Sequence, residues 1–347
     1  MDKFAFLIHP RDIKDIKKNI PVVRILPDKL IELIIELWGF SVCSEFEVLR
    51  NNKKVKGYLI WVGFTSKKMM ESPRGRVQKI ILKASLFAQN KLGASIIGLG
   101  ALTTSVTEGG MWLVSQPGIN LTVTHGDTYA AAVSEEGIEK IFDIYKFTNK
   151  NIKVAIVGAY GIIGREITSF LAKKGYSLVL IEKSEEKVNL IKQKIEKDGF
   201  SKDLFIISTD LSNISQSDLV VATTSHHSAL LKGEHLKRGA IVYDIAQPEN
   251  ISSSLLKERP DLIKIDGGYV NIGDIDIKFN LGTPKGIAFG CLVETIMMAL
   301  EREKNHHVGE IKESYVAELK KWAKKYGFHH ASFTAFGKPV SGMHKIM

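Results

Sequence analysis

Short apolar runs and amphipathic helices alternate along the second half of the chain. The runs are rich in valine, isoleucine and leucine, which is typical of buried strands. Strands are predicted at 153–157, 177–181, 204–208, 219–222, 241–244 and 262–266. Because strands that alternate with helices form a parallel sheet covered on both faces, this pattern predicts a doubly wound, Rossmann-like α/β domain.

The first part of the chain mixes shorter strands with amphipathic helices. Strands are predicted at 4–8, 46–49, 57–63 and 95–99, and helices near 28–38 and from Pro73 onward. We therefore expect a smaller α/β domain over 1–126, the Rossmann-like domain over 127–302 and a helical tail over 303–347. A helix at 129–147 is expected to lead into the second domain, and the chain is expected to fray from Ser332.

The most informative stretch is a glycine-punctuated turn directly after the strand at 153–157. Its glycines let backbone N–H groups approach a pyrophosphate, and the helix that follows adds favourable partial charge. A glycine turn that serves only the packing of a strand on a helix is the alternative. The strand before the turn and the apolar helix face after it favour a dinucleotide site. We assign to this site Gly158, Tyr160, Gly161, Ile162, Ile163 and Gly164.

Glu182 ends the next strand, at a position where an acidic side chain holds a ribose hydroxyl and favours NAD. Lys183 and Lys187 follow closely and are suited to a 2′-phosphate, so NADP stays open. A solvated charge at the end of a strand is the third interpretation of Glu182.

Later strand ends supply further candidates, because ligands of open α/β sheets bind at the carboxyl ends of the strands. Thr223, Thr224 and Ser225 are expected to border the far half of the cofactor. Asp244 is either a cofactor contact or the cap of a turn.

Composition narrows the class of protein. The apolar content of 44% and the charged content of 25% are those of a soluble globular protein. Two cysteines make a disulfide framework improbable, and no uncharged apolar run is long enough to span a membrane. With a start that does not resemble a signal peptide, this predicts a cytoplasmic protein with at most peripheral membrane contact.

The net charge of +10 suggests acidic partners or phosphate-bearing substrates. The basic residues are scattered along surface helices, without the aromatic residues that single-strand binders place among them, so we expect no nucleic-acid partner. A basic surface that is merely solvated is the plainest interpretation.

Cys291 is the candidate nucleophile. It lies near the start of a helix expected over 287–301, away from that helix's apolar stripe and on the same face as Glu294. A helix N-terminus lowers the pKa of a thiol, so we expect Cys291 to be activated. The alternative is a small buried hydrophobic residue, as free cysteines usually are and as we expect of Cys43.

Several motifs together resemble one family. They are Gly98–Ser105, Gly126–Thr128, Gly158–Gly164, Asp244 with Pro248 and Asn250, Asp266–Gly268, and Phe289–Glu294. Their order and spacing resemble the long-chain acyl-(acyl carrier protein) reductases, which form fatty aldehydes in cyanobacterial alkane synthesis. The resemblance covers roughly residues 57–302.

This resemblance implies reduction of an acyl thioester to an aldehyde with NADPH, through an acyl-cysteine intermediate. It implies that Cys291 is the nucleophile, that Glu294 orients the thiol or relays a proton, and that residues 1–126 bind the acyl chain. The chain departs from the family pattern at Asp127, Tyr129 and Glu182. Glu182 makes NADH possible as the cofactor.

The substrate would be a thioester of acyl carrier protein or of coenzyme A. Carrier proteins are acidic, and we expect them to meet a basic helix face. That face consists of Arg74, Arg76, Lys79 and Lys83. For the acyl chain, we expect residues 77–87 and 96–104 either to line an apolar slot or to form plain core.

Two other functions remain open at this point. One is an NAD(P)-dependent dehydrogenase of a small amino or hydroxy acid, which needs no cysteine. The other is a protein without catalysis that binds NAD(P) as a sensor.

Overall fold

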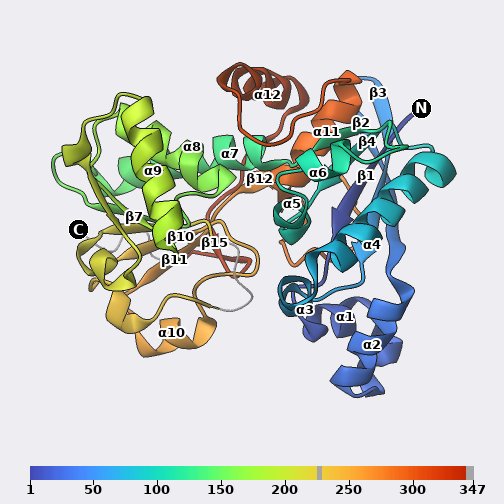
Figure 1. Ribbon diagram of the computed structural model, residues 1–347, viewed down its shortest axis with the longest axis horizontal. Helices are drawn as coiled ribbons and strands as arrows, with labels where there is room; N and C mark the ends of the chain where they lie inside the picture. The colour runs from blue at the N-terminus through green and yellow to red at the C-terminus, as the bar shows by residue number, and fades with distance from the viewer. Residues whose placement is uncertain (225–228, 341–347) are drawn as a thin grey trace. The chain divides into compact units, whose positions relative to one another are not determined.

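The computed structural model describes residues 1–224 and 229–340, which form two compact units (Figure 1). The first unit consists of Met1–Ala130 and Val270–His329, and the second of Ala131–Tyr269 and His330–Met347. The domain boundaries expected at 126 and 302 are therefore wrong for the later part of the chain, because residues 270–302 pack with the N-terminal segment.

A five-stranded sheet forms the centre of the first unit, in the order β2-β3-β1-β4-β5. Only β2 is antiparallel to its neighbour. The strands are β1 (Asp2–Ile8), β2 (Phe40–Arg50), β3 (Lys53–Val62), β4 (Ile96–Leu99) and β5 (Thr122–Thr124). The sequence pattern predicts four of these strands, β2 only in part, and misses β5.

Helices surround this sheet, and among them α4 and α11 pack directly on its strands. The helical segments are α1 (Ile13–Asn19), η1 (Pro21–Ile25), α2 (Asp28–Trp38), α3 (Ser66–Glu71), α4 (Arg74–Phe87), η2 (Ala88–Leu92), α5 (Leu102–Val106), α6 (Met111–Val114), α11 (Gly290–Glu301) and α12 (Glu313–Tyr326). A Cβ added to Gly98 on β4 would lie 2.0 Å from Thr295 Oγ1 on α11. This close approach is the packing that assigns α11 to the first unit.

The second unit contains a six-stranded, fully parallel sheet with the order β11-β10-β9-β6-β7-β8. The strands are β6 (Val154–Val157), β7 (Leu178–Ile181), β8 (Phe205–Ser208), β9 (Leu219–Ala222), β10 (Ile241–Asp244) and β11 (Ile263–Asp266). The strand order reverses between β6 and β9, as in the dinucleotide-binding Rossmann fold. The predicted fold class is confirmed, with every strand of this sheet within one residue of expectation.

The helices of the second unit cover both faces of its sheet. The apolar sides of α7, α8 and α9 pack on one face, and α10 packs on the other. Their bounds are α7 (Asp127–Tyr145), α8 (Ile162–Lys173), α9 (Glu185–Lys197) and α10 (Ser253–Glu258), with short turns η3 (Lys202–Leu204), η4 (Leu211–Gln216) and η5 (Gly233–His235). The first residues of α7 belong to the first unit.

The C-terminal region is more than a helical tail. After α12 the chain forms β14 (His329–His330) and a hairpin of β15 (Thr334–Ala335) and β16 (Lys338–Pro339), while β12 (Tyr269–Asn271) and β13 (Ile287–Phe289) join β14 in a small sheet. The carboxylate of Asp266 accepts hydrogen bonds from Thr334 Oγ1 at 2.7 Å and from the N–H of Gly337 at 2.8 Å. These bonds fix residues that the sequence pattern predicted to fray.

Among the described residues, no helix combines the length and the apolar character that a membrane span requires.

Candidate functional sites

The glycine turn of the second unit connects β6 to α8. Gly158 has φ +87°, and a Cβ there would lie 2.8 Å from the backbone of Thr224. A Cβ on Gly164 would lie 2.2 Å from the carbonyl oxygen of Gly158. Gly161 is the N-cap of α8, whose first turn has no side-chain cap within the described chain. The turn therefore presents bare backbone and a helix N-terminus, which suits a pyrophosphate.

Glu182 lies directly after β7 and is buried. Its carboxylate accepts a hydrogen bond from the N–H of Tyr160 in the glycine turn at 2.8 Å and one from the N–H of Lys183 at 3.2 Å. Lys187 Nζ lies 3.5 Å from Glu182 Oε2. Glu182 is therefore not a solvated strand-end charge, and Lys187 has an acidic partner.

The carboxyl end of β9 borders the glycine turn. Thr223 Oγ1 lies within hydrogen-bond distance of the carbonyl oxygens of Val157 at 3.0 Å and Gly158 at 3.1 Å. The carbonyl of Thr224 accepts a hydrogen bond from the Asn250 amide at 3.1 Å. Ser225 lies outside the described residues. Thr223 and Thr224 therefore lie beside the glycine turn, and the expectation that they border the far half of the cofactor stays a prediction.

Asp244, at the end of β10, organises a loop. Its carboxylate accepts hydrogen bonds from the N–H groups of Asn250 at 2.7 Å, Ile251 at 3.2 Å and Ala246 at 3.3 Å. Burial raises the pKa of Asp244 to about 7. The turn-capping interpretation accounts for these bonds, and a direct role in cofactor binding stays a prediction.

The candidate nucleophile lies at the start of α11 in the first unit. Cys291 is partly exposed, whereas the rest of α11 as far as Leu300 is buried. Gly126, with φ +72°, faces it so closely that an added Cβ would lie 2.4 Å from the Cys291 Cβ. The loop before α7 therefore lies against the cysteine, with its glycine at the point of contact.

Two carboxyl groups adjoin Cys291. Glu294 is fully buried, and it accepts hydrogen bonds from Thr124 Oγ1 at 2.5 Å and from the N–H of Tyr129 at 2.7 Å. Burial raises the pKa of Glu294 to about 7. Burial, together with the charge of Glu294, raises the pKa of half-buried Asp127 to about 8. Glu294 is therefore not a charge on the helix surface, and Asp127 is a further residue of the site around Cys291.

The thiol of Cys291 is not activated in this structure. Its pKa is raised to about 12, mainly by burial and next by the negative charge of Asp127. The hydrogen bond from the N–H of Leu292 lowers the pKa by less than the charge of Asp127 raises it. The expectation of a lowered pKa is wrong here. The helix N-terminus contributes only about 1 kcal/mol, which desolvation beside two acids outweighs.

His125 is a residue of this site that the sequence interpretation missed. It is fully buried, and its Nδ1 accepts a hydrogen bond from the N–H of Asp127 at 2.9 Å. Burial lowers the pKa of His125 to about 3, so the ring is neutral. The sequence signal that could have identified His125 is its position directly before Gly126 and the start of α7.

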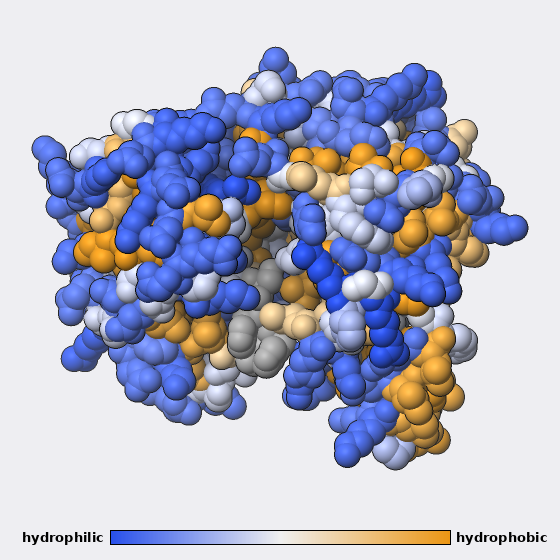
Figure 2. All heavy atoms as spheres, in the orientation of Figure 1, coloured by the Kyte–Doolittle hydropathy of each residue, from blue (hydrophilic) through white to orange (hydrophobic). Residues whose placement is uncertain are grey.

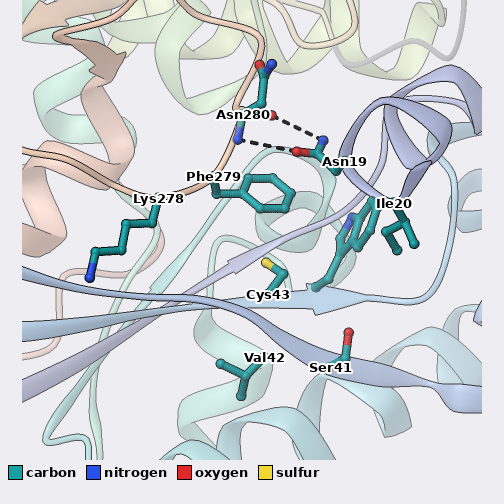
Figure 3. A pocket seen from close by; sticks show the side chains of 9 residues that line it. Asn19, Ile20, Ser41, Val42, Cys43, Lys278, Phe279 and Asn280 are labelled. Atoms are coloured by element: carbon teal, nitrogen blue, oxygen red, sulfur yellow. Dashed lines mark hydrogen bonds between the residues drawn. The ribbon is translucent and has the colours of Figure 1, made fainter. Parts of the chain in front are cut away.

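Cys43 lines a pocket of about 400 Å³ elsewhere in the first unit (Figure 3). Trp61 and Phe279 are among its other walls. At its edge the Asn19 side-chain amide donates to the backbone carbonyl of Asn280 and accepts from the Asn280 backbone N–H. Cys43 Sγ donates to the carbonyl of Leu59 at 3.5 Å, and burial raises its pKa to about 12. These contacts agree with a structural cysteine.

The segments expected to hold an acyl chain are packed. Residues of α4 and β4, including Val77, Ile81 and Ile97, belong to the core of the first unit. The basic residues of α4 are exposed, although Arg74 pairs with Glu108 at 3.3 Å and Arg76 with Glu36 at 3.1 Å. The structure therefore supports the plain-core interpretation for these two segments and leaves the basic face available.

Comparisons with known proteins agree with a Rossmann domain. A family model for shikimate / quinate 5-dehydrogenase matches residues 138–267. The aminotransferase PigE of Serratia sp. is 24% identical over 97% of this chain and 41% of its own length. A very-long-chain 3-oxoacyl-CoA reductase of Neurospora crassa is 25% identical over 53% of this chain and 52% of its own. The chain thus spans about half of these curated relatives or less.

Among solved structures, L-tryptophan dehydrogenase of Nostoc punctiforme is 12% identical over 94% of this chain and 80% of its own, with a TM-score of 0.42. The strand order, the glycine turn and the match over 138–267 identify an oxidoreductase-type Rossmann domain of the kind that binds NAD(P).

Proposed function

We propose that this chain reduces an acyl thioester to an aldehyde with a reduced nicotinamide cofactor, through an acyl group held on Cys291. The observation that supports this most is the surroundings of the sulfur. Cys291 is partly exposed at a helix N-terminus, it lies against the backbone of Gly126, and two carboxyl groups with raised pKa values adjoin it. A plain core cysteine needs none of these features.

The two carboxyl groups supply the base that a thiol of high pKa requires. With pKa values of about 8 and about 7, Asp127 is mostly protonated at neutral pH and Glu294 is about half ionised, so the pair can accept a proton. As the sulfur of Cys291 attacks the thioester carbon, the pair accepts the thiol proton. The same proton then passes to the sulfur of the departing carrier, which leaves as a thiol.

Reduction of the acyl-cysteine needs a hydride, which a bound NADH or NADPH supplies. The resulting thiohemiacetal oxyanion requires hydrogen-bond donors, and the uncapped first turn of α11 offers backbone N–H groups. Protonation of the sulfur as the carbon–sulfur bond breaks then releases the aldehyde and restores Cys291.

The residues of the second unit fit a nicotinamide dinucleotide. Gly158, Gly161 and Gly164 would hold the pyrophosphate, because they form the turn that leads into the N-terminus of α8, where backbone N–H groups suit an anion. Glu182, fixed to the glycine turn through Tyr160, favours a ribose hydroxyl over a 2′-phosphate. We therefore propose that NADH serves at least as well as NADPH.

The carrier of the acyl group is proposed to be coenzyme A or acyl carrier protein. The exposed basic residues of α4 suit either one, since both are negatively charged. The relative from Neurospora crassa is named for an acyl-CoA substrate, which is consistent with this class of substrate.

A second candidate function is the dehydrogenation of a small hydroxy or amino acid. The match to shikimate / quinate 5-dehydrogenase over 138–267 favours it, and so does the high pKa of Cys291, because this reaction needs no thiolate.

Replacement of Cys291 separates the two functions. With palmitoyl-CoA and NADH, C291A should lose aldehyde formation by about a thousandfold or more, since a nucleophile is removed. C43A serves as the matched control and should retain wild-type turnover. If C291A forms aldehyde at the wild-type rate, Cys291 is not the nucleophile and the acyl-cysteine mechanism is wrong. If wild type and C291A oxidise a small hydroxy acid equally well and no thioester is reduced, the second function is correct.

A further inference from the structure

A stripe of large apolar side chains is exposed on α2 and on η1 before it. The exposed fractions are 53% for Leu33, 77% for Leu37 and 73% for Trp38 on α2, and 77% for Val22 and 88% for Ile25 on η1. Figure 2 shows an apolar area over α2, with hydrophilic residues beside it. We refer to these five side chains as the apolar face.

The core of the first unit does not require this face. The inner side of α2 is already packed, since Ile31 and Ile35 belong to a cluster with Ile16 and Trp61. The exposed leucines lie on the other side of the helix at helical spacing. A helix that is apolar on two sides, one buried and one exposed, marks an interaction surface, because isolated soluble domains seldom expose contiguous apolar area.

The residues around the apolar face are basic. Lys14, Lys18, Arg24 and Lys29 are exposed near it on α1, η1 and α2. The three acids of α2 pair with basic residues: Asp28 with Lys17 at 2.7 Å, Glu32 with Lys68 at 4.0 Å, and Glu36 with Arg76 at 3.1 Å and Lys68 at 3.7 Å. The free charge beside the face is therefore positive.

We propose that α2 and η1 dock on the surface of an anionic lipid bilayer. Leucine and tryptophan side chains that insert at the headgroup boundary, flanked by lysine and arginine, are the features of interfacial helices. The surface charge of an anionic leaflet attracts such a basic rim. A second copy of the chain is less suitable, because facing copies would place like charges against each other.

Co-sedimentation of the full chain with vesicles tests this proposal. We expect binding to vesicles of phosphatidylcholine with phosphatidylglycerol, at least about tenfold weaker binding to phosphatidylcholine alone, and loss of binding in high salt. Trp38 fluorescence should shift to the blue on binding, and W38F should lose that shift.

Two sets of variants assign the binding to the face. L33S/L37S/W38S should weaken it by about tenfold or more, and K18Q/R24Q/K29Q should abolish the preference for anionic lipid. The control I206S, which changes an exposed apolar residue in the second unit, should bind as wild type does. Unchanged thermal unfolding shows that the variants fold.

Three results would overturn the proposal. These are no binding to any vesicle, binding unaffected by L33S/L37S/W38S, and a dimer seen in sedimentation velocity that those three substitutions dissociate. The last result assigns the apolar face to a second copy of the chain. None of these measurements depends on reduction of a thioester.

Discussion

Two glycine-containing loops, one in each unit, use close backbone approach differently. At Gly158 and Gly164 the glycines let the turn after β6 pack against the end of β9 and against itself, and the turn leads into the N-terminus of α8. At Gly126 the glycine brings a loop against Cys291 and confines two carboxyl groups beside a thiol. The first loop is suited to binding, and the second alters the chemistry of its neighbours.

This difference shows which properties of a site can be recognised from a local sequence motif. The turn at 158–164 is recognisable because its glycines and the start of the following helix lie within one short stretch of sequence. The properties of the Cys291 site depend on burial and on contacts such as that of Glu294 with Tyr129, which lies 165 residues earlier. The pKa values there reverse the expectation from helix position alone.

The largest expected effect is on stability, at the glycine that faces Cys291. G126A places a Cβ 2.4 Å from that of Cys291 at a positive φ. It should lower the free energy of unfolding by about 3 kcal/mol, through steric overlap and backbone strain. Urea denaturation measures this. The control G75A adds a methyl to open space in α4 and should not destabilise the chain; equal stability of G126A and wild type would contradict the packing.

The raised carboxyl pKa values predict a pH-dependent stability. Asp127 has a pKa of about 8 in the folded chain, above its unfolded value, so folding takes up a proton. Its stabilising contribution is complete below the unfolded pKa and is lost as pH rises to about 8. Between pH 6.5 and 8, D127N should gain about 2 kcal/mol relative to wild type. A pH-independent difference between D127N and wild type would contradict a raised pKa.

In the second unit the same kind of substitution should affect binding. G164A places a Cβ 2.2 Å from the carbonyl oxygen of Gly158, whereas at Gly161 the nearest such contact is 3.3 Å. We expect G164A to weaken NADH binding by about tenfold or more, and G161A by less, because only the former displaces the turn. Calorimetric titration measures both. Wild-type affinity in G164A would argue against the assigned cofactor loop.

The smallest effect is on thiol reactivity. Because the charge of Asp127 raises the pKa of Cys291, D127N should speed its alkylation by iodoacetamide at pH 8 by about fivefold. Peptide mass spectrometry follows Cys43 in the same sample as an internal control. An increase at both cysteines would indicate general loosening instead of a local charge effect.

The sequence predicted the second unit almost completely and the first less well. Runs of β-branched residues bounded by turns are sufficient to locate all six strands of a buried parallel sheet. The strand β5 was missed because it has only three residues, two of them threonine. The division of the chain was misplaced because α11 follows the Rossmann sheet in sequence but packs on β4, a long-range contact that no local pattern encodes.

The sequence predicted two residues of the candidate site, missed His125, and did not predict the site's properties. Cys291 and Glu294 were found from helix position and family resemblance. The burial of Glu294, the raised pKa of Asp127 and the neutral state of His125 arise from packing between segments far apart in the chain.

The proposed function is tested most directly by mass spectrometry of the intact protein after incubation with palmitoyl-CoA in the absence of cofactor. We predict one added palmitoyl group, located on the peptide that contains Cys291, absent in C291A and released as aldehyde when NADH or NADPH is added. A wild-type protein that stays unmodified, or an acyl group on another residue, would contradict the proposal.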